Sequence, residues 1–311
     1  MGPGIEIFCP ATVANVGPGF DILGFALDSP GDIIRLQTTK EKHHILENIS
    51  GVNLPADPAK NVATVALDAM LGAMHSKVKF RITFRQKIPA GSGIGSSAAS
   101  SAGAVYAANV LLGSPFSEKE LIPFAMKGEE VASGSEHADN VAPALIGGFV
   151  LVRSYHPLDV FRIPSPERIC CTIVHPDISI STEDSRKILK ASVPLKTAVT
   201  QCGNIAGLVT GLITGDFRLI RDSMQDVIAE PIRSFLIPEY DRVKKAAMES
   251  GALGCNISGS GPSIFALGEN EETATRTGKA MEDVFKAIGI NSDVFVSQVN
   301  RQGIKILSKT P

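Results

Sequence analysis

Alternation of apolar and polar residues predicts strands in the first half of the chain. Within residues 80–88, Phe80, Ile82 and Phe84 alternate with polar side chains, the period of a strand with one buried face. Shorter runs predict further strands at residues 5–8, 33–38 and 147–154. The first of these is expected to stop at Pro10, and residues 29–32 are expected to form a turn because they combine serine, proline, glycine and aspartate.

Apolar residues at helical spacing predict helices between these strands. Residues 61–73 show this spacing, and Asn61 stands where a helix cap is expected. A second helix is expected from the serine run after residue 95 to about residue 112, and a third over residues 117–133. The first half therefore mixes strands and helices.

Three prolines crowd residues 157–166, and we place a domain boundary there, between residues 1–155 and 156–311. Beyond it the pattern predicts strand, helices, two strands, helix and strand, which is a split βαβ arrangement. The helix expected over residues 197–213 is apolar nearly all round and is expected to be buried. The other expected helices cover residues 181–190, 238–250 and 271–288, and the expected strands cover residues 169–174, 253–257, 263–267, 293–299 and 304–307.

A glycine-rich loop links the strand at residues 80–88 to the helix that follows it. Gly91, Gly93 and Gly95 let the backbone turn its N–H groups into one concavity, and the helix start adds free amides and a positive dipole end. Such a corner suits phosphate. No Gly-Lys-Ser/Thr closes the loop, and Ser96 stands where a dinucleotide fingerprint has glycine. A plain tight turn is the alternative.

Composition excludes several classes of function. The 311 residues are 44% hydrophobic, the net charge is −2 and there is no basic block or tryptophan, so nucleic acid is not an expected partner. Five scattered cysteines without C-x-x-C spacing argue against a disulfide framework and a zinc site, and most are expected to be buried thiols. No signal pattern or membrane-spanning run is present. We therefore expect a soluble cytoplasmic protein with no membrane partner.

Polar residues are concentrated at residues 134–143, directly before an apolar segment. Glu136, His137, Asp139 and Asn140 lie too close together to be an ordinary solvated face. They are expected either to line a cleft or to form a cap and turn.

Residues 89–98, PAGSGIGSSA, resemble the phosphate loop of the galacto-, homoserine, mevalonate and phosphomevalonate (GHMP) kinase superfamily. Residues 10–21, 137–143 and 229–233 are similar to the homoserine kinase family in particular, and the glycine loop at residues 257–262 fits as well. The resemblance covers about residues 5–307. It implies an α+β fold of two domains, the first ribosomal-protein-like and the second ferredoxin-like, with a cleft between them.

The resemblance also implies roles on the nucleotide side. It assigns ATP binding to the phosphate loop and the contact with adenine to Asn61. It assigns Mg²⁺ to Ser97 and Glu129, for which a helix N-cap and a surface carboxylate are the alternatives. The loop residues concerned are Pro89, Ala90, Gly91, Ser92, Gly93, Ile94, Gly95, Ser96 and Ser97.

For the acceptor, homoserine, the resemblance implies that Arg186 and Arg233 bind the carboxylate, a role suited to the guanidinium group. Asn15, Asp21 and Asp139 match positions for the ammonium group, and His137 and Asn140 line the same site. Asn140 stands where mevalonate-type relatives have an aspartate, and asparagine cannot accept a proton at neutral pH. Catalysis would then rest on positioning and charge neutralisation; Asp21 or Asp139 as a base stays open.

The expected activity is Mg²⁺-dependent transfer from ATP to L-homoserine, giving O-phospho-L-homoserine for threonine biosynthesis. The expected partners are these small molecules, and a homodimer is expected from the resemblance alone. One alternative is a sister kinase acting on mevalonate or a sugar. Another is a catalytically silent nucleotide-binding regulator, against which the presence of both Ser97 and Glu129 argues.

Overall fold

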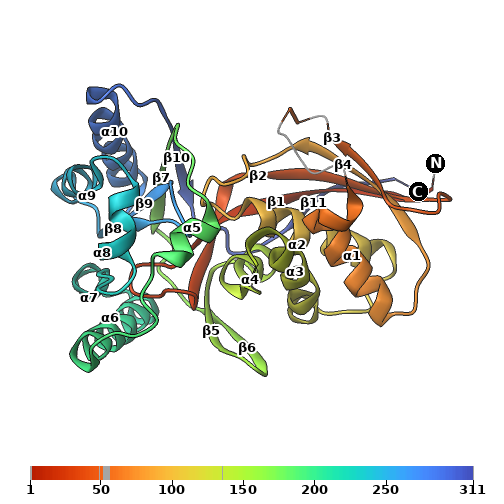
Figure 1. The fold of residues 1–311 in the computed structure, drawn as a ribbon, viewed down its shortest axis with the longest axis horizontal. Coiled ribbons are helices and arrows are strands. Elements are labelled where there is room, and N and C mark those ends of the chain that lie inside the picture. Colours follow the sequence, from red (N-terminus) through yellow and green to blue (C-terminus); the bar gives the residue numbers. More distant parts are fainter. Residues whose placement is uncertain (1, 49, 52–56, 135, 311) are drawn as a thin grey trace.

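The computed structural model describes residues 2–48, 50–51, 57–134 and 136–310, and it consists of two sheets with helices packed against them (Figure 1). The first sheet has seven strands in the order β11-β1-β2-β4-β3, with β5 paired to β2 and β6 paired to β5. Its strands are β1 (Gly4–Ala14), β2 (Leu23–Thr39), β3 (Ile45–Asn48), β4 (Lys79–Gln86), β5 (Phe149–Tyr155), β6 (Leu158–Ile163) and β11 (Lys305–Thr310).

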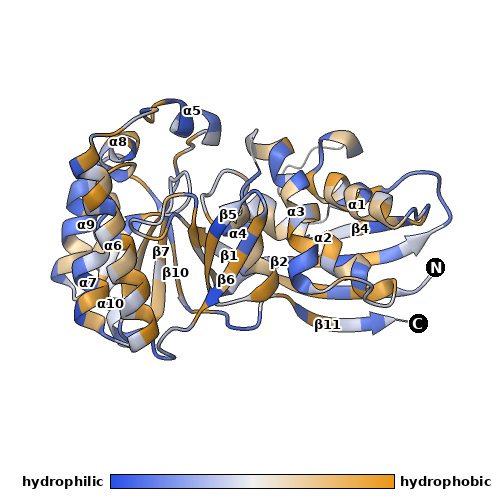
Figure 2. Ribbon diagram, turned by 90° about the horizontal axis from the view of Figure 1, so that it is seen from below, coloured by the Kyte–Doolittle hydropathy of each residue, from blue (hydrophilic) through white to orange (hydrophobic). Residues whose placement is uncertain are grey.

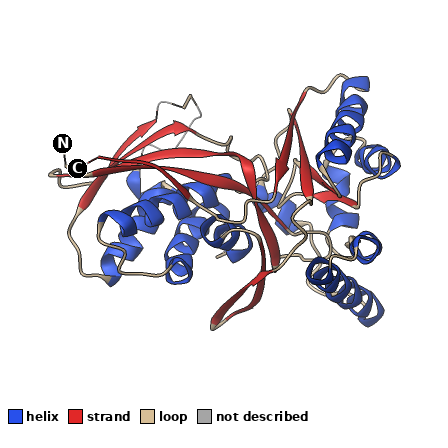
Figure 3. Ribbon diagram, turned by 180° about the vertical axis from the view of Figure 1, so that it is seen from behind, coloured by secondary structure: helices blue, strands red, loops and turns tan. Residues whose placement is uncertain are grey.

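Four helices cover one face of this sheet (Figure 3). They are α1 (Val62–Ala73), α2 (Ser96–Leu111), α3 (Glu118–Ser133) and α4 (Ala138–Ile146), and a 3₁₀ turn (Pro58–Lys60) precedes α1. Helix α2 is central and contacts the other three. Its alanines, serines and Gly103 permit this close approach, since a Cβ on Gly103 would come within 2.7 Å of Ile34. Phe80, Ile82 and Phe84 are buried in this core, as the alternation predicts.

The second sheet has four strands in the order β10-β7-β9-β8, with every neighbouring pair antiparallel. Its strands are β7 (Cys170–Pro176), β8 (Gly254–Ile257), β9 (Ile264–Gly268) and β10 (Ser292–Gln298). Its helices are α5 (Thr182–Lys187), α6 (Leu195–Thr214), α7 (Phe217–Ser223), α8 (Glu230–Arg233), α9 (Tyr240–Glu249) and α10 (Glu271–Ala287), with a 3₁₀ turn at Ser234–Leu236. Helices α9 and α10 carry both apolar and polar colour, as expected of helices that cover a sheet (Figure 2). The expected split βαβ pattern and the two-domain α+β fold are confirmed.

Two expectations about the first strands are wrong. Strand β1 does not stop at Pro10 but continues to Ala14, and a register shift between Pro10 and Thr12 accommodates the missing N–H of the proline. Residues 29–32 do not form a turn that ends a strand: they lie within the 17-residue strand β2. Both strands are extended because they pair with each other along most of their length, a contact that local sequence does not reveal.

The expectation that the apolar helix at residues 197–213 is buried is also wrong. Helix α6 lies on the outside of the second domain, where α7 and the short hairpin strand β6 are its neighbouring elements among the described residues. Leu195 is 80% exposed and Val199 is 63% exposed, whereas Gln201 and Leu208 face inward. Apolar composition therefore did not predict the environment of this helix.

The chain returns to the first sheet after the second domain is complete. Strand β11 pairs with β1 near the amino terminus, so both ends of the described chain lie together (Figure 1). Strand β6, which precedes the second domain, also belongs to the first sheet, because it pairs with β5. The expected boundary after residue 155 would separate these strands from the sheet to which they are hydrogen-bonded. We therefore propose a boundary after residue 163, with residues 305–310 completing the first domain.

Four of the five cysteines (Cys9, Cys170, Cys171 and Cys255) are buried free thiols, as expected, and Cys202 on α6 is exposed. Within the described part of the chain, no helix is long and apolar enough to cross a bilayer.

Candidate active site

A cleft of about 610 Å³ is lined by residues of both domains. It brings together every predicted site residue except Pro89 and Ile94. These two instead line a second cavity of about 200 Å³, and Ile94 is 2% exposed and packed in the core. Their side chains therefore do not face the cleft, although the loop that contains them borders it.

The glycine loop adopts the backbone that its sequence predicts. Gly91, Gly93 and Gly95 have φ values of +74°, +79° and +71°, and Gly95 is the N-cap residue of α2. Such left-handed backbone is accessible to glycine at little cost. The start of α2 therefore borders the cleft, directly after a loop whose left-handed backbone favours glycine.

A second loop, Ser258–Ser263 from the second domain, holds the glycine loop in place. The Ser258 hydroxyl donates to the Gly93 carbonyl over 2.7 Å, and the Ser263 hydroxyl donates to the Ser92 carbonyl over 2.6 Å. A Cβ on Gly93 would come within 2.7 Å of two carbonyl oxygens of this second loop. The shape of the cleft beside the glycine loop thus depends on a close contact between domains.

Lys87 supplies a buried cation at the base of α2. Its ammonium lies 3.0 Å from Asp32 Oδ2 and donates to the carbonyl and the hydroxyl of Ser96 over 2.7 and 2.6 Å. The side chain of Lys87 is 2% exposed and that of Asp32 is 0% exposed. Lys87 was not predicted as a site residue, although a lysine at the end of a strand directly before a glycine loop is a signal that could have identified it.

Ser97 and Glu129 meet at the edge of the cleft through a hydrogen bond from α2 to α3. Burial raises the pKa of Glu129 to about 7, while the Ser97 hydroxyl and the charge of Lys87 lower it. The neighbouring Glu130 is exposed and paired with Lys127. One hydroxyl and one carboxylate are hard oxygen donors, and they fit Mg²⁺, which usually takes one or two protein ligands beside phosphate. No group of three metal-binding His, Cys, Asp or Glu side chains occurs among the described residues.

Asn61 is the N-cap residue of α1, as its position before the helical spacing predicts. Its Oδ1 accepts a hydrogen bond from the Ala63 N–H over 3.0 Å, and the residue is 2% exposed. It also lines the cleft. The adenine contact implied by the resemblance stays a prediction.

Arg186 of α5 crosses the cleft to Asp21 of the first domain. Its two terminal nitrogens donate to the two Asp21 oxygens over 3.1 and 2.7 Å, a bidentate pair. Arg186 also hydrogen-bonds His137 Nε2. Burial and the charge of Arg186 lower the pKa of His137, so the imidazole is neutral and accepts this bond.

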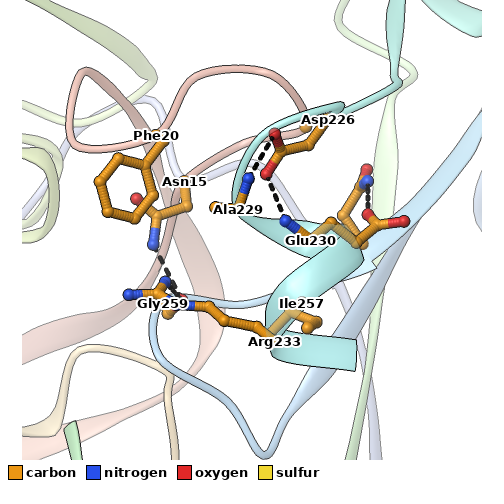
Figure 4. Close-up of a pocket in the computed structure, with 10 residues that line it drawn as sticks. Asn15, Phe20, Asp226, Ala229, Glu230, Arg233, Ile257 and Gly259 are labelled. Carbon is orange, nitrogen blue, oxygen red and sulfur yellow. Dashed lines mark hydrogen bonds between the residues drawn. The ribbon is translucent and has the colours of Figure 1, made fainter. Parts of the chain in front are cut away.

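Arg233 lies at the end of α8, with a side chain that is almost fully buried. Its Nε donates to the Ser185 carbonyl over 3.1 Å, and one terminal nitrogen donates to the Gly259 carbonyl over 3.0 Å (Figure 4). The guanidinium lies 4.9 Å from the ring centre of Phe20. Burial and the nearby Arg186 lower the pKa of Arg233 to about 10, so it is still cationic at neutral pH.

Asn15 and Asp21 belong to a strained loop between β1 and β2. Both are non-glycine residues in the left-handed region, with φ values of +58° and +59°. Asn15 Oδ1 accepts from the Asp21 N–H over 2.8 Å, Asn15 Nδ2 donates to Gly259, and the Tyr155 hydroxyl donates to the Asp21 carbonyl. Backbone strain that is held by this many contacts is typical of a functional site.

Asp139 and Asn140 open helix α4 between the two sides of the cleft. Burial, together with the charges of Asp21 and Glu129, raises the pKa of Asp139 to about 7. Asn140 Oδ1 accepts a 2.7 Å hydrogen bond from Thr12 and would lie 3.1 Å from a Cβ on Gly95. Asp139 and Asn140 therefore lie between the glycine loop and the Arg186–Asp21 pair. Asp21, the third predicted catalytic residue, is itself part of that pair.

Comparisons with known proteins agree with this arrangement. The chain matches the family models "GHMP kinases N terminal domain" over residues 59–148 and "GHMP kinases C terminal" over residues 208–287. It is 45% identical to a homoserine kinase of Chlorobium phaeobacteroides, with 96% of this chain and 98% of that protein covered. It is 37% identical to a homoserine kinase of Pyrococcus abyssi, with 95% and 97% covered. The crystal structure of homoserine kinase from Cytophaga hutchinsonii superposes with a TM-score of 0.94 at 52% identity, covering 98% of this chain and 97% of that one.

Proposed function

The chain belongs to the homoserine kinase family of the GHMP kinases, and we propose that its cleft transfers the γ-phosphoryl group of ATP to the hydroxyl of L-homoserine. The product is O-phospho-L-homoserine, an intermediate of threonine biosynthesis. In this assignment the glycine loop binds the triphosphate through main-chain N–H groups and the helix dipole of α2. The buried ammonium of Lys87 adds positive charge beneath the same loop.

One observation carries the choice of acceptor: groups of opposite charge line the cleft beside the glycine loop. Arg186 and Arg233 are suited to an α-carboxylate, and Asp21 and Asp139 are suited to an α-ammonium. Arg186 and Asp21 neutralise each other in the unliganded protein, and a zwitterion can replace this pair pole by pole. Mevalonate has a carboxylate but no ammonium, and galactose has neither.

We propose that Ser97 and Glu129 hold Mg²⁺ together with the phosphate oxygens. When bound, the ion neutralises charge that develops on the transferred phosphoryl group. Glu129 must be ionised for this role, and the hydrogen bond from Ser97 and the charge of Lys87 favour that form.

We propose that Asn140, Asp139 and Asp21 orient the acceptor and that no strong base is required. Asn140 accepts a hydrogen bond from Thr12, which fixes its amide group beside Gly95. Asp139 has a pKa of about 7 and is therefore available to accept a proton at neutral pH, whereas Asp21 is occupied by Arg186. Alignment of the hydroxyl with the γ-phosphorus then supplies most of the acceleration.

A homodimer and a cytoplasmic location are the remaining parts of the proposal. The dimer follows from the family resemblance, and the location follows from the composition and from the lack of a signal pattern or membrane-spanning run in the sequence. Light scattering after size exclusion tests the dimer, since the single chain has a mass of 32.8 kDa.

A panel of acceptors tests the proposed reaction. The purified protein is incubated with ATP, Mg²⁺ and either L-homoserine, mevalonate or galactose, while ADP release and the phosphorylated product are followed. Turnover with L-homoserine alone is expected, with O-phospho-L-homoserine identified by ³¹P NMR. Turnover that favours mevalonate or galactose would assign the sister activity. ATP binding without ADP release for any acceptor would favour the silent regulator.

A further inference from the structure

Helix α6 carries one buried polar side chain with no part in the assigned site. Gln201 is 5% exposed, although the helix around it is largely open to solvent. Its Nε2 donates to the Pro18 carbonyl over 2.8 Å and to Asp226 Oδ1 over 2.9 Å. Its Oε1 accepts from the Val227 N–H over 2.9 Å. One side chain thus links the β1–β2 loop of the first domain to the segment that precedes α8.

The chemistry of these bonds requires an amide. Two donors and one acceptor are used at the same time, and among side chains of this length glutamine alone offers both. Glutamate would place its charge against the Asp226 carboxylate and the Pro18 carbonyl. Methionine has nearly the same shape but would leave the buried Pro18 carbonyl and the half-buried Val227 N–H without this partner, and it would remove one of the hydrogen bonds to Asp226.

Each segment that Gln201 joins carries part of the acceptor site. Pro18 lies in the loop that holds Asn15 and Asp21. On the other side, Asp226 accepts the N–H groups of Ile228, Ala229 and Glu230 and so fixes the start of α8. Figure 4 shows Asp226 over this end of α8, with Arg233 extending from the helix toward Gly259.

We propose that Gln201 is a positioning residue for the acceptor: it sets the spacing between the loop that carries Asp21 and the helix that carries Arg233. This inference rests on the proposed function, since it assumes that these two residues bind the two poles of the acceptor. Gln201 lines neither the cleft nor the glycine loop. Its loss should therefore weaken acceptor binding far more than nucleotide binding.

The test compares Gln201→Met with Asn204→Leu. Asn204 lies one turn further along α6 and donates to the Gln225 carbonyl over 2.8 Å, so its substitution removes a bond to the same segment without affecting Pro18 or Asp226. Gln201→Met is expected to raise KM for L-homoserine about tenfold with KM for ATP within twofold of the original, while Asn204→Leu leaves both nearly unchanged. If Gln201→Met does not fold, Gln201→Asn retracts the amide by one methylene and should show the same selectivity to a smaller extent.

A double substitution separates positioning from general stability. If Gln201 acts through Arg233, the Gln201→Met change should raise KM for L-homoserine much less in an Arg233→Ala background, because the group that it positions is already missing. Equal increases in KM for both substrates, unchanged KM for L-homoserine or full additivity with Arg233→Ala would overturn the inference. These outcomes leave the proposed function standing, which fails only if the unsubstituted protein does not phosphorylate L-homoserine.

Discussion

The side of the cleft that we propose for the nucleotide is built mainly from backbone, whereas the side that we propose for the acceptor is built from charged side chains of both domains. Gly91, Gly93 and Gly95 present a curved main chain ahead of α2. Across from it, Arg186 and Arg233 come from the second domain and Asp21 from the first. A triphosphate offers several anionic oxygens that the main-chain N–H groups of one helix start can bind, so a short local motif suffices. Selection of one small acceptor requires side chains placed by the whole fold.

This comparison predicts that changes on the two sides of the cleft separate kinetically. Substitutions of the residues proposed to bind Mg²⁺ should lower kcat, and substitutions in the glycine loop should raise KM for ATP before they affect L-homoserine. Substitutions among the charged side chains opposite should affect L-homoserine first.

The largest effect is expected for Glu129→Gln. The amide cannot supply the anionic oxygen that Mg²⁺ needs, so kcat should fall about 10²- to 10³-fold at ordinary Mg²⁺. Glu130→Gln is the matched control, because Glu130 is the next residue on the same helix but is exposed. This variant should retain its kcat. Retained turnover in Glu129→Gln would place the metal elsewhere.

Arg233→Ala should weaken the binding of L-homoserine without weakening that of ATP. Removal of a buried cation that binds a carboxylate typically costs about 2–5 kcal/mol, so KM for L-homoserine should rise at least about thirtyfold while KM for ATP changes little. Steady-state kinetics with each substrate varied in turn gives both values. Equal increases for both substrates would refute the assignment of Arg233 to the carboxylate.

Gly93→Ala and Gly91→Ala sharpen the account of the nucleotide side. Both positions have positive φ, but a Cβ on Gly93 would clash with two carbonyl oxygens of the second domain, whereas a Cβ on Gly91 meets no atom within 4 Å. Gly93→Ala should therefore raise KM for ATP about tenfold. Gly91→Ala should have a smaller effect, because its only cost is the backbone strain of alanine in the left-handed region, about 1 kcal/mol. If the two variants had the same KM for ATP, the contact between the two loops would not contribute to nucleotide binding.

The smallest effect concerns pH and stability. Burial raises the pKa of Asp139 to about 7, so the folded protein holds a proton that the unfolded chain has already released near pH 4. Stability must then fall as pH rises through 7, by about 1 kcal/mol between pH 6 and pH 8 for this group. Asp139→Asn should remove this contribution in urea titrations of the unliganded protein and leave that of Glu129, whose pKa burial also raises to about 7.

Asp222→Asn on the exposed face of α7 serves as the control for this experiment. It should unfold with the same pH dependence as the original protein. A slope in Asp139→Asn as steep as that of the original protein would show that the carboxyl of Asp139 is ionised in the folded state at pH 6.

Sequence reasoning was most successful where the determinants are local. The strand, glycine loop and helix around Gly93 follow from neighbouring residues, and the structure has them as expected. The split βαβ pattern of the second domain is equally local, because each strand and helix there carries its own periodicity. The resemblance to a known family added the acceptor residues, which lie far apart in the chain and which the structure brings into one cleft.

The failures share a physical cause, which is dependence on distant partners. Pro10 did not end a strand because the long pairing with β2 carries the chain past it. Helix α6 was expected to be buried because of its composition, yet it packs on one face only. Gln201 was missed for the same reason, since Pro18 and Asp226 become its neighbours through folding alone.

The most direct measurement is a crystal structure with a non-hydrolysable ATP analogue, Mg²⁺ and L-homoserine bound together. The account predicts the triphosphate against the amides of residues 91–97, the homoserine carboxylate on Arg186 and Arg233, its ammonium at Asp21, and its hydroxyl directed at the γ-phosphorus. An empty glycine loop, or the two substrates bound in separate places, would contradict it.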